Sequence, residues 1–414
     1  MVGRHVQRLL PRRRHRSPRR ARGPRSHLRL PARRRAGRGP ARRSVSSRAR
    51  RAGARRRGAR RGRRKLRGSV RRARRSLRRA RHEEGCMKAV LFDGKGGPEI
   101  VRFAETSDPA PARGEVLVRV RAAALNRADL LQRRGLYPPP PGTREDIPGL
   151  ELAGEVAAVG AGVTAWKAGD RVMAIASGEA QAELAVAHER MLVRIPDALS
   201  SEDAAAIPEA CVTSHDALFT LGGLRPGWPV LVHAIGSGVS TAALQIAKAA
   251  GATVIGTSRT ADKLERARAL GLDHGILVAK DEPRFAEEVR RLTGKRGCPL
   301  VLDFVGAPYA AENLAALASG GRVVVIGTMG GPKAQLDLGL LMRARGAIVG
   351  TVLRPRPLEE KIAATQAFAR DVLPLVAAGA VKPVVDLVLP AERAREAHER
   401  MERNESFGKL VLTF

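Results

Sequence analysis

The sequence predicts an α/β protein in which a small β-barrel domain precedes a doubly wound parallel sheet, behind an arginine-rich segment. Three observations support this prediction. Basic residues crowd into the first 86 positions. Residues 87–210 contain short strands punctuated by glycine and proline, which favours a barrel. Residues 211–346 alternate apolar runs with helical segments, which is typical of parallel βαβ units.

Charge separates the first segment from the rest of the chain. Residues 1–86 hold 36 basic side chains and two acidic ones, whereas the net charge of the whole chain is +36. The stretch 87–414 is therefore nearly neutral. Because 1–86 has few apolar residues to offset chain entropy, and because its like charges repel, we expect this segment to be disordered.

Three interpretations of 1–86 stay open. The segment can be an upstream start in a GC-rich gene, because its dominant residue types have GC-rich codons and Met87 opens a well-formed strand. It can be a tail for nucleic acid, binding without sequence preference because it has no aromatic residue to stack on bases. It can also be an arginine-rich transit peptide.

Bulk features argue against a membrane or secreted protein. No stretch reaches the roughly 18 consecutive apolar residues of a membrane helix, and no apolar region follows Met1. Cys86, Cys211 and Cys298 are odd in number and far apart, which favours a reducing compartment and gives no metal-finger spacing. We therefore expect a cytoplasmic protein without a membrane partner.

The elements follow in order along the chain. Val116, Val118 and Val120 alternate with more polar neighbours, which predicts a strand. Other strands of the first domain are predicted at 87–92, 149–156 and 169–173. The run 229–235 is apolar throughout, as in a strand buried on both faces. Helices are then predicted at 240–250 and 261–270, and strands at 252–256, 275–278, 299–305, 322–327 and 347–352. Residues 347–414 end in a strand, Lys409–Thr413, and are expected to rejoin the first domain.

The turn after the apolar run predicts a dinucleotide site. Gly236 and Gly238 permit a tight turn into a helix, whose N-terminus suits a pyrophosphate. The predicted cofactor-binding turn also includes Ser237, between the glycines, and Val239, after them. The third glycine of the usual fingerprint is replaced by Ser240 or Thr241. A glycine-rich turn without a ligand is the alternative, but the strand before and the helix after it favour the site.

The end of the next strand indicates which cofactor fits. An NAD site usually has an acidic residue there, on the ribose 2′-hydroxyl. This chain instead has Ser258, Arg259 and Lys263, which favour the 2′-phosphate of NADPH. The alternative is that Arg259 and Lys263 are simply solvated helix residues.

The domain order resembles the medium-chain dehydrogenase/reductase superfamily, which implies a GroES-like catalytic domain and a Rossmann domain. Zinc members carry a catalytic cysteine and a Gly-His-Glu triplet; here those places read Ala123–Asn126 and Gly149-Leu150-Glu151. Cys211 falls near the third ligand position but stands alone, and zinc needs three or four ligands. We therefore expect no metal.

Five motifs resemble the zinc-independent quinone oxidoreductases, the zeta-crystallin-like branch. They are Ala124-Leu-Asn-Arg-Ala-Asp-Leu-Leu-Gln-Arg-Arg-Gly-Leu-Tyr-Pro-Pro-Pro-Pro-Gly142, Ile207-Pro-Glu-Ala210, His233-Ala-Ile-Gly-Ser-Gly-Val239, Gly327-Thr-Met-Gly-Gly331 and His398-Glu-Arg-Met-Glu-Arg-Asn404 with Gly408-Lys409. The resemblance covers 87–414. It implies NADPH-dependent reduction of a quinone or related conjugated carbonyl, by a homodimer or larger oligomer. Ser240 and the segment 276–278 depart from the family pattern and put cofactor affinity in question.

Site residues follow from this resemblance and from the chemistry of hydride transfer. Asn126 is expected to bind the nicotinamide ribose or the substrate oxygen, and Tyr137 to donate a hydrogen bond to the developing oxyanion, unless it is a packing residue. Asp129 is a catalytic candidate or a structural turn acid. The remaining cofactor candidates are Thr213, Gly327, Thr328, Met329, Asn404 and Lys409. Two alternatives stay open, a 2-enoyl or enone reductase and a non-catalytic NADPH-binding protein.

Overall fold

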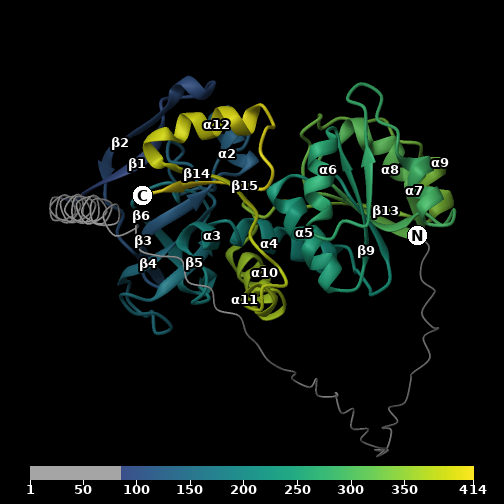
Figure 1. The fold of residues 1–414 in the computed structure, drawn as a ribbon. Helices are drawn as coiled ribbons and strands as arrows, with labels where there is room; N and C mark the ends of the chain where they lie inside the picture. The colour runs from purple at the N-terminus through teal and green to yellow at the C-terminus, as the bar shows by residue number, and fades with distance from the viewer. Residues whose placement is uncertain (1–84) are drawn as a thin grey trace, which may run out of the picture. The chain divides into compact units, whose positions relative to one another are not determined.

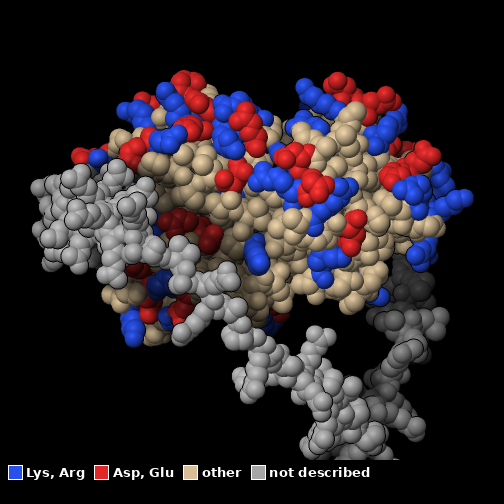
Figure 2. All heavy atoms as spheres, in the orientation of Figure 1, with Lys and Arg blue, Asp and Glu red and all other residues tan. Residues whose placement is uncertain are grey.

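The computed structural model describes residues 85–414, which belong to one compact unit. The predictions for the arginine-rich segment 1–86 fall on residues 1–84, which lie outside the described residues, and on residues 85–86, of which Cys86 already belongs to the first strand. Within the described part, acidic and basic side chains are interspersed on the face drawn in Figure 2. Many are paired, as Arg190 is with Glu359 and Arg291 with Glu288. This mixture fits the near-neutral composition of 87–414.

The GroES-like domain is built on a seven-stranded sheet. Its strands are β3 (Glu115–Ala124), β4 (Glu151–Val159), β5 (Arg171–Ile175), β6 (Leu184–His188), β7 (Leu192–Arg194), β14 (Val385–Pro390) and β15 (Lys409–Thr413), in the order β14-β15-β3-β4-β5-β7 with β6 against β3. A hairpin of β1 (Cys86–Phe92) and β2 (Val101–Ser107) forms a separate sheet. Val116, Val118 and Val120 are fully buried, which confirms the predicted strand and its inner face.

The second domain is a six-stranded parallel sheet of Rossmann type (Figure 1). Its strands are β8 (Pro229–Val232), β9 (Thr253–Ser258), β10 (His274–Leu277), β11 (Cys298–Asp303), β12 (Leu317–Val325) and β13 (Ala347–Gly350). The spatial order β10-β9-β8-β11-β12-β13 is the 3-2-1-4-5-6 order of a dinucleotide-binding sheet. The helices between these strands are α5 (Gly238–Ala249), α6 (Ala261–Arg268), α7 (Ala286–Leu292), α8 (Ala310–Ala316) and α9 (Leu338–Ala344).

The apolar run of β8 is buried because both faces of the sheet are covered. Val230 and Val232 pack into a core with α5, whereas Leu231 packs into a second core with Phe285 and Val289 of the α7 region. The strand ends at Val232, earlier than the sequence predicts. Ala234 has a φ of 48°, which turns the chain out of the sheet and begins the loop into α5.

The C-terminal part of the chain crosses back to the barrel. It contains α10 (Leu358–Asp371), α11 (Leu373–Ala377), β14, α12 (Ala394–Glu402) and β15. β15 pairs antiparallel with β3, with Val411 opposite Ala124. Just before β15, the Gly408 amide donates to the Gly236 carbonyl oxygen at 2.8 Å. The start of β15 therefore lies between the barrel and the turn that precedes α5.

Candidate active site

The turn between β8 and α5 has the construction of an anion-binding site. Ser237 caps α5, and its hydroxyl accepts a hydrogen bond from the Ser240 amide at 3.2 Å. Ser240 in turn donates from Oγ to the His233 carbonyl oxygen at 2.8 Å, so the residue that replaces a glycine of the fingerprint holds the turn to the end of β8. A helix N-terminus combines a positive dipole end with unpaired N–H groups, so this turn fits a pyrophosphate.

Two glycines of this turn lie against lysine side chains. A β-carbon on Gly238 would come within 2.3 Å of Lys409 Cδ, and one on Gly236 within 2.8 Å of Lys263 Cδ. The structure thus brings two of the predicted turn residues next to the predicted lysines, Gly236 to Lys263 and Gly238 to Lys409. Any larger residue at 236 or 238 would have to displace a lysine stem.

Basic side chains gather around the end of β9. Ser258 is buried and accepts from the Thr260 amide at 3.1 Å, while Arg259 is exposed. Lys263 donates from Nζ to the Asn404 carbonyl oxygen at 2.6 Å. Burial, together with neighbouring cations that include Arg259, lowers the pKa of Lys263. Four of the predicted residues therefore lie near one another here. We call this group the cation clamp; its members are Ser258, Arg259, Lys263 and Asn404.

Arg127 joins the cation clamp from the barrel. Its Nη2 donates to Asn404 Oδ1 at 2.7 Å, and burial together with Arg134 and Arg259 lowers its pKa. Asn404 holds a φ of 58°, a left-handed conformation that asparagine tolerates. Arg127 was not among the predicted site residues, although it stands inside the first of the five motifs.

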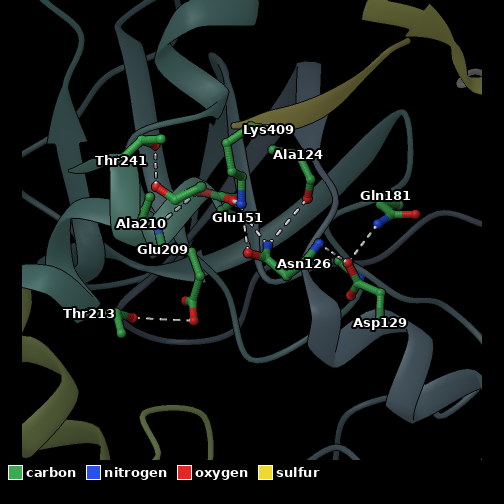
Figure 3. A network of polar contacts seen from close by, with 12 residues as sticks. Ala124, Asn126, Asp129, Glu151, Gln181, Glu209, Ala210, Thr213, Thr241 and Lys409 are labelled. Atoms are coloured by element: carbon green, nitrogen blue, oxygen red, sulfur yellow. Dashed lines mark hydrogen bonds and ion pairs between the residues drawn. The ribbon is translucent and has the colours of Figure 1, made fainter. Parts of the chain in front are cut away.

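A buried polar network of Lys409, Glu151 and Asn126 lies at the starts of β15 and β4, the two strands on either side of β3 (Figure 3). Lys409 Nζ lies 2.5 Å from Glu151 Oε1 and donates to Asn126 Oδ1 at 2.6 Å. Asn126 Nδ2 donates to the same Glu151 oxygen at 3.0 Å. Most of the hydrogen-bonding capacity of Asn126 and Lys409 is therefore used inside the protein.

Asp129 occupies the position of a helix-capping acid. Its carboxylate accepts from the Asn126 amide at 2.7 Å, from the Gly149 amide at 3.2 Å and from Gln181 Nε2 at 3.2 Å. The side chain is fully buried, and this burial raises its pKa to about 6. These contacts fit the structural alternative stated for Asp129, because the capping box starts α2 (Arg127–Arg133).

Helix α4 (Pro208–His215) carries Glu209 and Thr213 beside the nucleotide turn. Ser214 Oγ donates to the Val239 carbonyl oxygen at 2.8 Å, which fastens α4 to that turn. The Glu209 amide donates to Glu151 Oε2 at 2.8 Å. Burial and the nearby Glu151 carboxylate raise the pKa of Glu209 to about 7. Glu209 was not among the predicted site residues, although it stands in the Ile207–Ala210 motif.

Tyr137 and Arg354 form a second wall of the site. The Arg354 guanidinium carbon lies 5.6 Å from the centre of the Tyr137 ring. Arg354 Nε donates to the Ser177 carbonyl oxygen at 2.6 Å, whereas its buried Nη2 has no hydrogen-bond partner among the described residues. Burial and Glu209 raise the pKa of Tyr137 to about 12, so its hydroxyl keeps its proton. No motif pointed to Arg354.

The predicted residues Gly327, Thr328 and Met329 lie at the carboxyl edge of the Rossmann sheet. They follow β12, and the Gly327 amide donates to the Asp303 carbonyl oxygen at the end of β11 at 3.3 Å. Thr328 and Met329 are exposed. Ligands of such sheets bind outside this edge, so Thr328 and Met329 are accessible to a ligand there.

Metal-binding groups do not assemble in the described residues. Between residues 85 and 414, no group of three or more His, Cys, Asp or Glu side chains could hold a metal ion. Leu150 is buried and apolar, and burial raises the pKa of the Cys211 thiol to about 12. No helix of this same range is both long and apolar enough to cross a membrane.

Comparison with known protein families gives two matches. Residues 112–197 match the alcohol dehydrogenase GroES-like domain, and residues 238–369 match the family described as zinc-binding dehydrogenase. A quinone oxidoreductase of Pseudomonas aeruginosa is 35% identical over 78% of this chain and 99% of its own. An acryloyl-coenzyme A reductase of Metallosphaera sedula is 34% identical over 79% of this chain and 100% of its own.

Solved structures show the same architecture. A structure titled NAD-dependent alcohol dehydrogenase has a TM-score of 0.70 and 36% identity, and covers 79% of this chain and 100% of its own. A mycobacterial protein complexed with NADPH has a TM-score of 0.71 and 30% identity over the same shares. The residues around the β8–α5 turn therefore lie in a fold that binds nicotinamide dinucleotides of both kinds.

Proposed function

The chain belongs to the medium-chain dehydrogenase/reductase superfamily and is a nicotinamide-dependent oxidoreductase, and from this premise we propose that it reduces a quinone or related conjugated carbonyl with NADPH and without zinc. One observation carries the proposal. Helix α4 joins the nucleotide turn directly to a site whose accessible groups are a tyrosine hydroxyl and a carboxyl. Such groups suit direct hydride transfer to an organic acceptor.

NADPH, when bound, supplies the hydride. We propose that the Gly236–Val239 turn holds its pyrophosphate and that the cation clamp of Ser258, Arg259, Lys263 and Asn404 holds the 2′-phosphate. No acidic residue stands at the end of β9 to bind a free 2′-hydroxyl. The residues proposed to hold the nicotinamide end are Thr213, Gly327, Thr328 and Met329, with Asn126 and Lys409 beneath.

The protein residues then position the acceptor and stabilise charge. Tyr137 donates a hydrogen bond to the acceptor oxygen as negative charge develops on it, because its raised pKa keeps the hydroxyl protonated. Arg354 adds positive charge above the same ring. We propose that Asn126 contacts the nicotinamide ribose. No step needs a metal, because the Tyr137 hydroxyl takes the place of a Lewis acid.

A second copy of the chain is the proposed partner protein. Strand β13 has one neighbouring strand in the described sheet, so the other edge offers unpaired backbone groups. Beside it, α9 has no buried residue, and Met342 is 76% exposed and Leu338 64%. An apolar sheet edge of this kind suits pairing with its own symmetry mate. The buried, unpaired thiols of Cys211 and Cys298 fit function in the reducing cytoplasm.

The acryloyl-coenzyme A reductase relative favours a second candidate, reduction of an enone or enoyl thioester. One experiment separates the candidates. NADPH oxidation by the purified full chain is followed with naphthoquinones and with an enone, and NADH is run in parallel. Turnover that prefers NADPH and a naphthoquinone supports the first candidate, and turnover that prefers NADPH and the enone supports the second. Tight NADPH binding without oxidation by any acceptor would leave a non-catalytic binding protein instead.

A further inference from the structure

Building on the proposed function, on which this inference rests, we propose that Glu209 is the proton donor of the reductase and that its acceptor is an α,β-unsaturated carbonyl compound, which takes the proton at its α-carbon. The proposal adds a catalytic group to the site and narrows the class of acceptor.

The Glu209 carboxyl is separate from the buried network behind it. Its backbone amide donates to Glu151, whose oxygens are also held by Lys409 and Asn126. The Glu209 side chain points away from these groups, toward Thr213 (Figure 3). Thr213 Oγ1 donates to Glu209 Oε1 at 3.5 Å, the single hydrogen bond of this half-buried carboxyl within 85–414. One face of the carboxyl is therefore open to a ligand.

This open face adjoins the place proposed for the nicotinamide. Glu209 and Thr213 are four positions apart on α4, so they share one face of the helix. The hydroxyl of the next residue, Ser214, donates a hydrogen bond to the carbonyl oxygen of Val239 in the nucleotide turn. An acceptor that lies against Thr213 and the turn would lie against Glu209 as well.

The charges around Glu209 keep a proton on it near neutral pH. Glu151 on β4 and Asp129 on α2 disfavour the carboxylate, whereas Lys409 on β15 favours it, and burial outweighs that attraction. Tyr137 and Arg354 lie close enough to Glu209 to interact with its charge. The pKa of Glu209 is about 7, but that of Tyr137 is about 12. Glu209 can release its proton, while Tyr137 only donates a hydrogen bond.

The reaction balances with these groups. A hydride from the dihydronicotinamide forms a C–H bond at the β-carbon, the carbon–carbon double bond breaks, and the electron pair moves to the carbonyl oxygen. The O–H bond of Glu209 then breaks as a C–H bond forms at the α-carbon. Solvent returns a proton to the Glu209 carboxylate. The net change consumes NADPH, the acceptor and one proton, and gives NADP⁺ and the saturated carbonyl compound.

Carbon protonation is the step that needs a positioned acid. The oxygen atoms of a reduced quinone exchange protons with water without help, whereas proton transfer to carbon is slow and gains from a fixed donor. A half-buried, neutral carboxyl beside the cofactor is therefore more useful to an enone reductase than to a quinone reductase.

The test compares the full chain with Glu209→Gln, which keeps the shape and cannot transfer a proton. The control is Glu287→Gln, a change at an exposed glutamate on α7. Each protein is given NADPH with 2-methylcyclohex-2-enone or with 1,4-naphthoquinone. Turnover, NADPH affinity and the configuration of the product at the α-carbon are measured. Wild-type turnover is also measured from pH 5 to 9. This measurement tests the role of Glu209 even if the variant fails to fold.

We expect Glu209→Gln to lower enone turnover by ~100-fold or more, far beyond its effect on naphthoquinone, and to give both configurations at the α-carbon. The control should match wild type. Wild-type enone turnover should fall as pH rises through about 7, because the acid form is the active one.

Parallel losses with both acceptors, an unchanged configuration or a flat pH profile would overturn the role of Glu209. A wild-type protein that reduces naphthoquinone but no enone would overturn the class of acceptor. A wild-type protein that reduces neither acceptor would instead refute the proposed function, and this inference with it.

Discussion

Lys409 Nζ lies 2.5 Å from Glu151 Oε1, in a pair where both side chains are almost completely removed from solvent. The pair joins the last strand of the chain to the barrel strand behind the proposed active site. A buried ion pair adds little stability over an apolar pair, but removing one partner leaves an uncompensated charge.

Lys409→Met should therefore lower the free energy of unfolding by about 3–5 kcal/mol. Urea unfolding followed by circular dichroism measures this change. The matched control is Arg190→Met, which breaks the exposed Arg190–Glu359 pair and should cost about 1 kcal/mol or less. Adding Glu151→Gln to Lys409→Met should restore part of the loss. If Lys409→Met and Arg190→Met lowered the free energy of unfolding equally, the buried pair would not have the role given to it here.

Arg259→Ala and Lys263→Ala should weaken NADPH binding by roughly 10- to 100-fold each, because each removes one charge-assisted hydrogen bond of about 1.5–3 kcal/mol to the 2′-phosphate. NADH binding should change little, since it has no such phosphate. Fluorescence titration with both cofactors measures the difference. Lys167→Ala, at an exposed lysine of the barrel, is the control. Equal weakening of NADH and NADPH would remove the proposed selectivity.

Arg127→Ala tests whether the barrel takes part in the same clamp. Arg127 is bonded to Asn404 and adds positive charge near Arg259. Its loss should raise the Kd for NADPH by roughly threefold to tenfold, less than the loss of Arg259, because Arg127 acts partly through Asn404. If NADPH affinity stays at the wild-type value, Arg127 has no part in cofactor binding and serves only to hold Asn404.

Tyr137→Phe should lower turnover by roughly 10- to 100-fold, because the variant cannot donate to the developing oxyanion. NADPH affinity should stay close to the wild-type value, since Tyr137 contacts Arg354 and, within 85–414, none of its hydrogen bonds or ring contacts is to the nucleotide turn. Steady-state kinetics and a cofactor titration together measure the two effects. Unchanged turnover would assign Tyr137 to packing beneath Arg354.

Met342→Glu combined with Ile348→Lys should convert a dimer into a monomer, because both side chains lie on the exposed apolar edge formed by α9 and β13. Sedimentation velocity at micromolar concentration measures the mass. Leu277→Glu is the control, at an exposed residue of β10 on the opposite edge of the same sheet. A wild-type chain that sediments as a monomer would refute the proposed assembly.

Local patterns predicted the fold class well. Alternating valines located β3, and the apolar run of β8 indicated a strand covered on both faces. Both predictions succeed because the spacing of apolar residues along the chain reports which faces of an element are buried. The end of β8 was placed too late because the left-handed turn at Ala234 carries no glycine. The sequence also placed Gly236, Lys263 and Asn404 among the cofactor residues, and the structure brings them together.

Glu209, Arg354 and Arg127 were not predicted, for a different reason. Each gains its chemistry from partners far away in the chain, such as Glu151 for Glu209, Tyr137 for Arg354 and Asn404 for Arg127. Asn126 shows the same limit, since Lys409 and Glu151 use most of its hydrogen-bonding capacity. Side chains that meet only through the tertiary fold leave no signature in local spacing.

The pairing of β15 with β3 also dictates an order of events during synthesis on the ribosome. All strands of the six-stranded sheet lie between residues 229 and 350, so that sheet can form while the C-terminal residues are still being added. The end of β3 at residues 122–124 must wait unpaired on that side until residues 411–413 leave the exit tunnel, whereas residues 115–119 already pair with β6. The nascent protein would therefore have its cofactor fold before its catalytic barrel closes, and the exposed edge of β3 is where a chaperone would be needed.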